Sequence, residues 1–300
     1  MKLNHLFFAL VAVHFCVPHA SAKTLLTESD LKTVESIVGW KGKLSSTENV
    51  FKISKPRTDR AVKIGSGQVS PFAGLTSWVS FTAGKKKTAM IMGDLVLFQD
   101  EVNPVIDALF ANGINVTAIH NHFFYEEPHV YFMHVSAEGN IENLAKGIKA
   151  ATDKQTANES LSEKFFFDFP SKHSISAEPL NKILGVTGEI KDGMYKAVFG
   201  RKTKMDCGCD VGKDMGVNTW AAFAGTDSSA TVDGDFAVTE GELQPVLRSL
   251  RKSNIAIVAI HSHMSGETPR ILFLHYWGRG HSQDLANGLK TALLLQKGQN

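Results

Sequence analysis

The stretch AIHNHFFYEEPHVYFMH, residues 118–134, contains four histidines, and a second stretch, AIHSHMSGETPRILFLH at residues 259–275, repeats three of them. Around these stretches, residues 93–149 align with residues 234–290 without a gap, and roughly a third of the aligned positions are identical. This period is far longer than the unit of a solenoid. The sequence therefore predicts a duplicated domain and not a repeat array.

Both copies show the same order of predicted elements: a helix ended by glycine, three strands, a helix, two strands joined by a loop, and a last helix. In the first copy the first helix falls at residues 28–38 and the three strands at 50–53, 76–82 and 89–98. The next helix begins at 99–101, the two joined strands fall at 115–122 and 130–137, and the last helix falls at 141–151. Pro104 and Pro245 are expected in the first turn of their helices, where proline is tolerated. We expect an α+β fold of two tandem similar domains, each a mixed or antiparallel sheet with helices, packed into one body.

The N-terminus has the pattern of a leader for export. A basic start at Met1-Lys2 is followed by the apolar run Leu6–Val17 and by the small residues Ala20–Ala22. This order predicts a signal peptide and a periplasmic or secreted protein. The run is too short to span a bilayer, and no membrane span is expected. The expected organisation is a signal peptide at 1–22, a first repeat domain at 23–155, a connecting segment at 156–176 and a second repeat domain at 177–300.

Composition limits the partners. The net charge is only +2 and the charged residues are intermixed, so the chain has no basic stripe for a phosphate backbone and nucleic acid is not an expected partner. Removal of the leader leaves Cys207 and Cys209. In an oxidising compartment they could pair across one glycine, and the alternatives are a soft-metal site or a dithiol that cycles.

The histidine spacing favours a metal site. Side chains two apart on a strand share a face, so His120 and His122 point the same way. If the next strand returns about a turn centred at residue 127, His134 lies opposite His120. Three imidazoles in this arrangement can hold a metal ion and leave a fourth position open. Because all three recur in two diverged copies, we expect Zn²⁺, or another divalent transition metal, at two groups of ligands: His261, His263 and His275 in the second copy, and His120, His122 and His134 in the first.

Other polar residues near these motifs have weaker interpretations. His129 has no counterpart in the second copy and is expected to be a loop residue. Glu126 and Glu267 recur in both loops. Each could be catalytic, as a general base beside the metal or as a partner of an imidazole, and the alternative is a carboxylate that caps the loop. Asp94 and Asp235 each follow a glycine, which is typical of a turn at the start of a strand, and the alternative is a catalytic acid.

The whole mature chain resembles the LppY/LpqO family of exported bacterial proteins (domain of unknown function 1259), on A-I-H-N-H…P-H-V-Y-F-M-H and its second copy A-I-H-S-H…P-R-I-L-F-L-H. H-x-H followed about twelve positions later by another histidine is also similar to the zinc site of acetolactate decarboxylase and of its superfamily, which includes the plant and prokaryote conserved domain. That resemblance implies a three-histidine zinc site in a duplicated α+β fold. It also implies a supporting Glu and Arg, for which Arg57 and Arg201 are candidates.

These features predict an exported metal-binding protein, a zinc-dependent enzyme that acts on a small ester or oxo-acid as a hydrolase or lyase. The substrate class is implied by the distant resemblance. The alternative is a non-enzymatic periplasmic protein that binds or senses a metal or small ligand. Either way the expected partner is a small molecule, and the sequence leaves the oligomeric state open.

Overall fold

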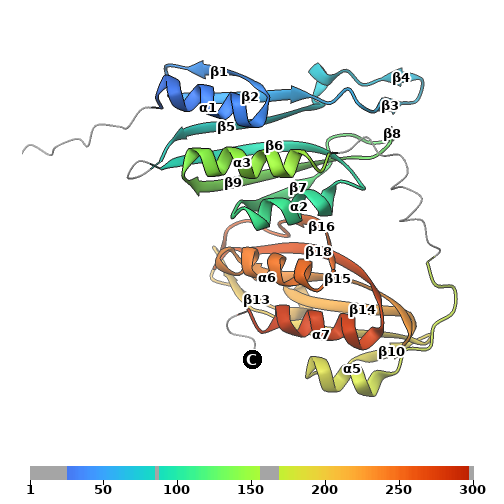
Figure 1. The fold of residues 1–300 in the computed structure, drawn as a ribbon. Coiled ribbons are helices and arrows are strands. Elements are labelled where there is room, and N and C mark those ends of the chain that lie inside the picture. Colours follow the sequence, from blue (N-terminus) through green and yellow to red (C-terminus); the bar gives the residue numbers. More distant parts are fainter. Residues whose placement is uncertain (1–25, 85–87, 156–168, 297–300) are drawn as a thin grey trace, which may run out of the picture.

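The computed structural model describes residues 26–84, 88–155 and 169–296, so the predicted signal peptide and most of the predicted connecting segment lie outside it. These residues form one twelve-stranded sheet, two small three-stranded sheets and six α-helices. All six helices lie on one face of the large sheet (Figure 1). They are α1 (Glu28–Val38), α2 (Val102–Ala111), α3 (Ile141–Thr152), α5 (Ala177–Leu184), α6 (Glu240–Lys252) and α7 (Ser282–Leu293).

The large sheet is antiparallel throughout and runs from one half of the chain into the other. The first half contributes, in spatial order, β1 (Lys41–Ser45), β2 (Val50–Pro56), β5 (Thr76–Ala83), β6 (Ala89–Phe98), β9 (Val130–Gly139) and β7 (Asn115–His120). The second half continues with β16 (Ala256–His261), β18 (Ile271–Gly280), β15 (Ser229–Thr239), β14 (Asn218–Thr226), β11 (Met194–Gly200) and β10 (Glu189–Lys191). The α+β class and the tandem similar halves are confirmed.

The two halves form one continuous sheet and not two packed sheets. β7 and β16 are the open edges of their half-sheets, and they pair at Ile119 and Ile260. Unpaired edges favour this kind of pairing. We call the β7–β16 pair the seam.

Side chains from the helices extend the hydrogen bonding of the seam. The amide of Asn103, on α2, accepts a bond from Ile257 N at 2.9 Å and donates to Ile257 O at 3.3 Å. Its second-half counterpart, Gln244 on α6, donates to Val116 O at 2.6 Å. These amides satisfy backbone groups that the short seam ladder leaves free.

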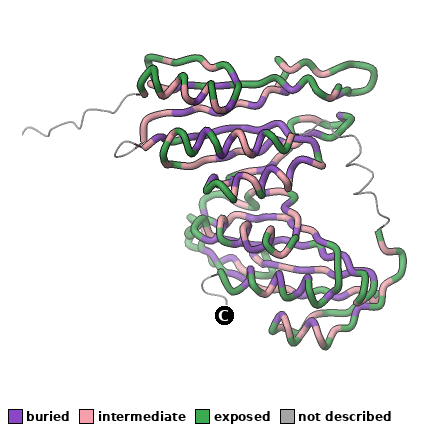
Figure 2. The backbone as a smooth tube through the Cα atoms, in the orientation of Figure 1, coloured by how far each residue is buried: buried purple, intermediate pink, exposed green. Residues whose placement is uncertain are grey.

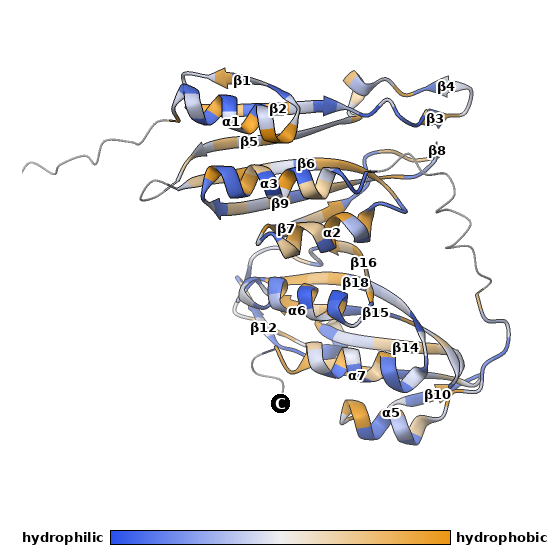
Figure 3. Ribbon diagram, in the orientation of Figure 1, coloured by the Kyte–Doolittle hydropathy of each residue, from blue (hydrophilic) through white to orange (hydrophobic). Residues whose placement is uncertain are grey.

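The main core lies between the helices and the sheet. Buried and partly exposed positions alternate along β5, as expected for a strand with one face on the core. Figure 2 shows buried positions along the strands and on the inner sides of the helices. Figure 3 shows hydrophobic and hydrophilic residues side by side on these helices, which are therefore amphipathic. No helix in the described part of the chain is long and apolar enough to cross a membrane.

Most helix boundaries follow the sequence signals. α1 and α5 end at Gly39 and Gly185, both in the left-handed conformation that glycine adopts readily. The prediction for Pro245 was wrong: it lies inside α6 and not in the first turn. α6 starts early because Thr239 is a favourable N-cap residue, whereas its first-half counterpart is Phe98.

Candidate metal centre

The histidines lie on the face of the sheet that the helices leave uncovered. On β9, Met133 and Val135 are buried in the core against the helices, so His134 between them points to the other face. On β18, Leu274 and Tyr276 are buried in the same core and flank His275 in the same way.

The register between the paired strands differs from the prediction by two residues. His134 pairs with Ala118, and His120 pairs with Phe132. The connection is not a simple hairpin because β8 (Glu126–Glu127) pairs with the separate strand β3 (Lys63–Ile64). A shift of two keeps every side chain on its predicted face, so His120 and His134 are diagonal neighbours and not opposite each other.

The first-half histidines come together in spite of this shift. The ring centroid of His120 lies 5.1 Å from that of His122 and 5.0 Å from that of His134. His122, just beyond the end of β7, stacks on Phe132 at 3.6 Å. Burial and the neighbouring His120 lower the pKa of His122, with Asp94 opposing. A lower pKa favours the neutral imidazole, which is the form that binds a metal ion.

The second-half histidines repeat this arrangement. The ring centroid of His261 lies 5.1 Å from that of His263 and 4.9 Å from that of His275. The Nδ1 atom of His261 lies 3.1 Å from Phe273 O, and that of His275 lies 3.2 Å from Gly234 O. A carbonyl only accepts, so in both rings Nδ1 donates, and in the neutral ring Nε2 is then the nitrogen that can bind a metal ion. Backbone carbonyls orient metal-bound imidazoles in this way.

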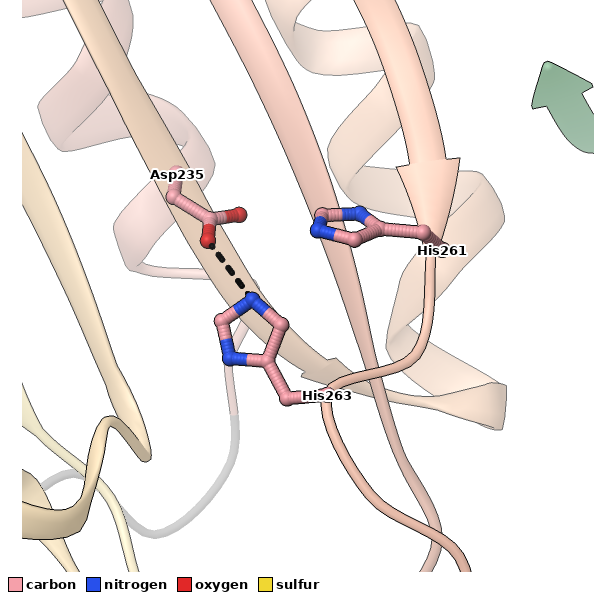
Figure 4. Close-up of side chains that lie close together, drawn as sticks. All are labelled: Asp235, His261 and His263. Atoms are coloured by element: carbon pink, nitrogen blue, oxygen red, sulfur yellow. Dashed lines mark ion pairs between the residues drawn. The ribbon is translucent and has the colours of Figure 1, made fainter. Parts of the chain in front are cut away.

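Asp235 joins this group, and the sequence interpretation of it as a turn residue was wrong. It lies within β15, opposite His275. Its carboxylate and the rings of His261 and His263 offer ligand atoms that all lie within 4.8 Å of one another (Figure 4). Asp235 Oδ2 is 3.6 Å from His263 Nε2.

The glycine before this aspartate has a packing role. A Cβ at Gly234 would collide with the carbonyl of Trp220 and with the Tyr276 side chain, so this position in the strand requires glycine. The sequence signal that could have identified Asp235 as part of the site was the recurrence of the Gly-Asp pair at Gly93-Asp94.

The electrostatics of the second-half group suit a cation. Asp235 is only 2% exposed, and within the described residues its Oδ1 has no hydrogen-bond partner. Burial raises the pKa of Asp235 to about 7, with His275 opposing. Burial also lowers the pKa of His261 and of His263. A buried carboxylate with an unpartnered oxygen is unfavourable alone, and a metal ion bound beside it would stabilise it.

The first half contains the same residues in a looser arrangement. Asp94 lies within β6 opposite His134, and its Oδ1 too has no hydrogen-bond partner among the residues that the structure covers. Over the described ranges, however, only the Asp235 group brings three ligand atoms within 4.8 Å of one another. The two copies therefore differ in how closely their ligands converge.

Both predicted catalytic carboxylates accept hydrogen bonds from backbone N–H groups where their loops end. Glu267 Oε1 accepts a hydrogen bond from Ile271 N at 3.1 Å, and Glu126 Oε1 accepts one from Val130 N at 3.4 Å. His129 is an exposed loop residue whose Nδ1 lies 3.3 Å from Glu126 Oε1. The loop-capping contacts are present, and a catalytic role for Glu126 or Glu267 stays a prediction.

Arg57 and Arg201 form buried ion pairs. Arg57 bonds Glu101 at 2.9 and 3.0 Å, and Arg201 bonds Glu242. Arg57 also donates to Val96 O, and Arg201 donates to Ala237 O. Each ion pair therefore connects the start of a helix to a strand of its own half-sheet.

Two further features lie in the second half. Cys207 and Cys209 form a disulfide. The loop that carries His263 lines a surface pocket of about 350 Å³, with Ser262, Met264 and Arg270 among its walls. A pocket of about 400 Å³ lies elsewhere, between α1, β2 and α3.

Fold and site together define a class: a duplicated α+β protein with a histidine–aspartate group on the open face of one shared sheet. The family model described as Domain of Unknown Function (DUF1259) matches two segments, residues 32–154 and 178–294, and the chain belongs to this family. The resemblance to that family is confirmed, whereas the one to the acetolactate decarboxylase superfamily stays a prediction. The comparison with curated proteins gave no match.

Two solved structures are similar over most of the chain. The trimeric bacterial microcompartment shell protein PduB has a TM-score of 0.20 and 11% identity, over 84% of this chain and 91% of that one. EtuB from Clostridium kluyveri has a TM-score of 0.20 and 8% identity, over 85% of this chain and 89% of that one. Scores this low carry no conclusion about function.

Proposed function

We propose that this chain is an exported metal-binding protein whose second half holds Zn²⁺, or another divalent transition metal, and uses it to act on a small oxo-acid or ester. The ligands are Asp235 and the histidines His261, His263 and His275. The observation that carries the proposal is the Asp235 carboxylate, buried with an unpartnered oxygen in the described structure and within 4.8 Å of ligand atoms of two imidazoles.

The donor set fits a borderline metal ion. Three imidazole nitrogens and one carboxylate oxygen suit Zn²⁺ and its neighbours in the first transition row. The carbonyls of Phe273 and Gly234 fix the tautomers of His261 and His275, so that Nε2 is the nitrogen available for binding. A bound ion would supply a Lewis acid that polarises a carbonyl or acidifies water.

The surroundings support a small anionic substrate. The side chain of His263 is 36% exposed, so small molecules can approach this part of the group from solvent. On the next strand, Trp220 lies opposite Asp235, and the Lys196 ammonium lies 4.5 Å from the centre of the Trp220 ring. A cation on this face of the sheet, two strands from Asp235, favours a carboxylate-bearing oxo-acid over a neutral ester. Glu267, in the His263 loop, is the proposed proton-transfer group.

One observation favours a second candidate function, a non-enzymatic metal binder or sensor. If Asp235 and all three histidines bind together, a tetrahedral Zn²⁺ has no open position, as in structural zinc sites. Catalysis would then require an ion of higher coordination number or displacement of one ligand.

Metal analysis of the untagged protein tests the proposal. We expect a divalent transition metal in wild type at the second-half site, and loss of that ion in His263→Ala. A panel of small esters and oxo-acids, assayed with metal-loaded wild type, then separates enzyme from binder. Turnover that His263→Ala lacks supports the enzyme, and stoichiometric metal without turnover of any panel member supports the binder. Metal content that His263→Ala leaves unchanged contradicts both.

A further inference from the structure

The first half carries the complete ligand set on the same face of the same sheet. Asp94 is 8% exposed, its Oδ1 has no partner within the described ranges, and it pairs across the strands with His134. His120 and His122 complete the set, with ring centroids 5.1 Å apart. A buried carboxylate oxygen without a hydrogen bond is costly unless a cation lies beside it.

The seam brings the two ligand sets next to each other. Antiparallel pairing of Ile119 with Ile260 places Ala118 beside His261 and Ala259 beside His120, one residue to either side. Because both isoleucines belong to the core on the helix side, these neighbours lie on the open face. The small side chains of Ala118 and Ala259 therefore lie between the two histidine groups on this face.

We infer that the first half binds a second divalent transition-metal ion, through Asp94, His120, His122 and His134, and that the two ions lie on one face about 14 Å apart. The inference goes beyond the proposed function, which needs only the ion of the second half.

The spacing follows from the sheet. His122 stacks on Phe132 of β9, and His263 stacks on Phe273 of β18 at 3.4 Å, so each group is centred over one of these two strands. The order β9-β7-β16-β18 separates them by three strand spacings. At ~4.8 Å per spacing the separation is about 14 Å, well beyond the ~3.5–4 Å of bridged two-metal sites. The ions therefore form two separate centres.

Metal stoichiometry of matched variants tests the second ion. The full mature protein, stripped with chelator and reloaded with Zn²⁺, is compared as wild type, His122→Ala, His263→Ala and the double variant, with His129→Ala as the control. Two ions in wild type and in the control, one in each single variant and none in the double variant are expected. If His122→Ala fails to fold, Asp94→Asn replaces it.

The other outcomes separate this inference from the proposed function. One ion in wild type, lost in His263→Ala and kept in His122→Ala, overturns the inference and leaves the proposed function intact. One ion lost in His122→Ala and kept in His263→Ala overturns the proposed function and the pair of ions, and it assigns the one ion to the first half. Wild type without metal overturns both. With Cu²⁺ in both sites, we expect a dipolar interaction in electron paramagnetic resonance that corresponds to about 14 Å. A separation under 8 Å or over 20 Å overturns the predicted geometry.

Discussion

Asp235 Oδ2 lies 3.6 Å from His263 Nε2, across the gap between strand β15 and the loop that follows β16. The other oxygen of the same carboxylate is buried and, in the described part of the molecule, without a hydrogen bond. The chain keeps this carboxylate in an environment that destabilises it when no cation is bound. Such an arrangement supports the proposed metal site.

Asp235→Asn is expected to separate stability from metal binding. Above neutral pH the metal-free variant should be about 1–3 kcal/mol more stable than metal-free wild type, because it lacks a buried, uncompensated charge. Its affinity for Zn²⁺ should fall at least about tenfold. Chemical denaturation in chelator measures the first effect and a competition titration the second. An unchanged affinity would show that Asp235 is not a ligand.

Metal binding should stabilise the fold by mass action. Zn²⁺ at about 100 times its dissociation constant raises the free energy of unfolding by about 2.7 kcal/mol. We expect the melting temperature to rise with Zn²⁺ in wild type and in His129→Ala, and to return to the starting value with chelator. His263→Ala should lose the part of this response that the second-half ion contributes, and a full response in that variant would rule out the second-half site.

Glu267 variants distinguish a loop-capping role from proton transfer. Glu267→Gln retains an oxygen that can accept from Ile271 N, so its stability should stay within about 1 kcal/mol of wild type. Glu267→Ala leaves that buried N–H unpaired and should cost about 1–3 kcal/mol. Both variants should still bind Zn²⁺. If a substrate is turned over, a large drop in kcat for the Gln variant would show that the carboxylate transfers a proton.

Protonation of Asp227 should lower the free energy of unfolding at acid pH. Hydrogen bonds from Ser176, aided by Ser282, lower the pKa of Asp227 below its usual range. The stabilisation of the fold by the ionised Asp227 is therefore fully present above the unfolded-state pKa of about 3.9. It is lost as the pH falls through the lower folded-state pKa. Asp227→Asn should lose roughly 0.5–1.5 kcal/mol at pH 7 and show a flatter stability curve below pH 4. An equally steep curve in the variant would contradict this assignment.

The buried Arg201–Glu242 pair should be sensitive to loss of one partner. The two side chains are 8% and 6% exposed, and Arg201 also donates to Ala237 O at 3.0 Å. Arg201→Met leaves the buried Glu242 carboxylate without its guanidinium partner and should cost about 3–5 kcal/mol. Replacing both residues, with Glu242→Leu added, should cost less than the sum of the two single changes. Denaturant titration of the three variants checks this, and simple additivity would show that the pair is not coupled.

Local signals in the sequence were enough for most of the secondary structure. The stop at Gly39, the alternation along residues 76–82 and the strand at 89–98 depend on neighbours within a few positions. The duplication was also visible, because identical residues recur at a constant separation. Pro245 was misplaced because the strength of the N-cap at Thr239 outweighed the usual position of proline.

The candidate site depended on contacts between distant segments. The sequence placed three histidines of each copy on one face, but a turn-centred register put His120 and His134 directly opposite each other. In the structure the connecting segment contains β8, which pairs with β3, and the register differs from the predicted one by two residues. Asp235 was misread because a Gly-Asp pair looks the same in a turn and in the middle of a strand.

The sequence by itself determined the α+β class, the duplication and the side of the sheet on which each histidine lies, because side-chain direction in a strand alternates with residue number. Only the tertiary structure decided that Asp235 faces His263, that β7 meets β16 at Ile119 and Ile260, and that both histidine groups share one open face. Those relations join segments far apart in the chain. They depend on which sheet edges pair and on where the helices pack, and neither can be deduced from the spacing of residues within a single motif.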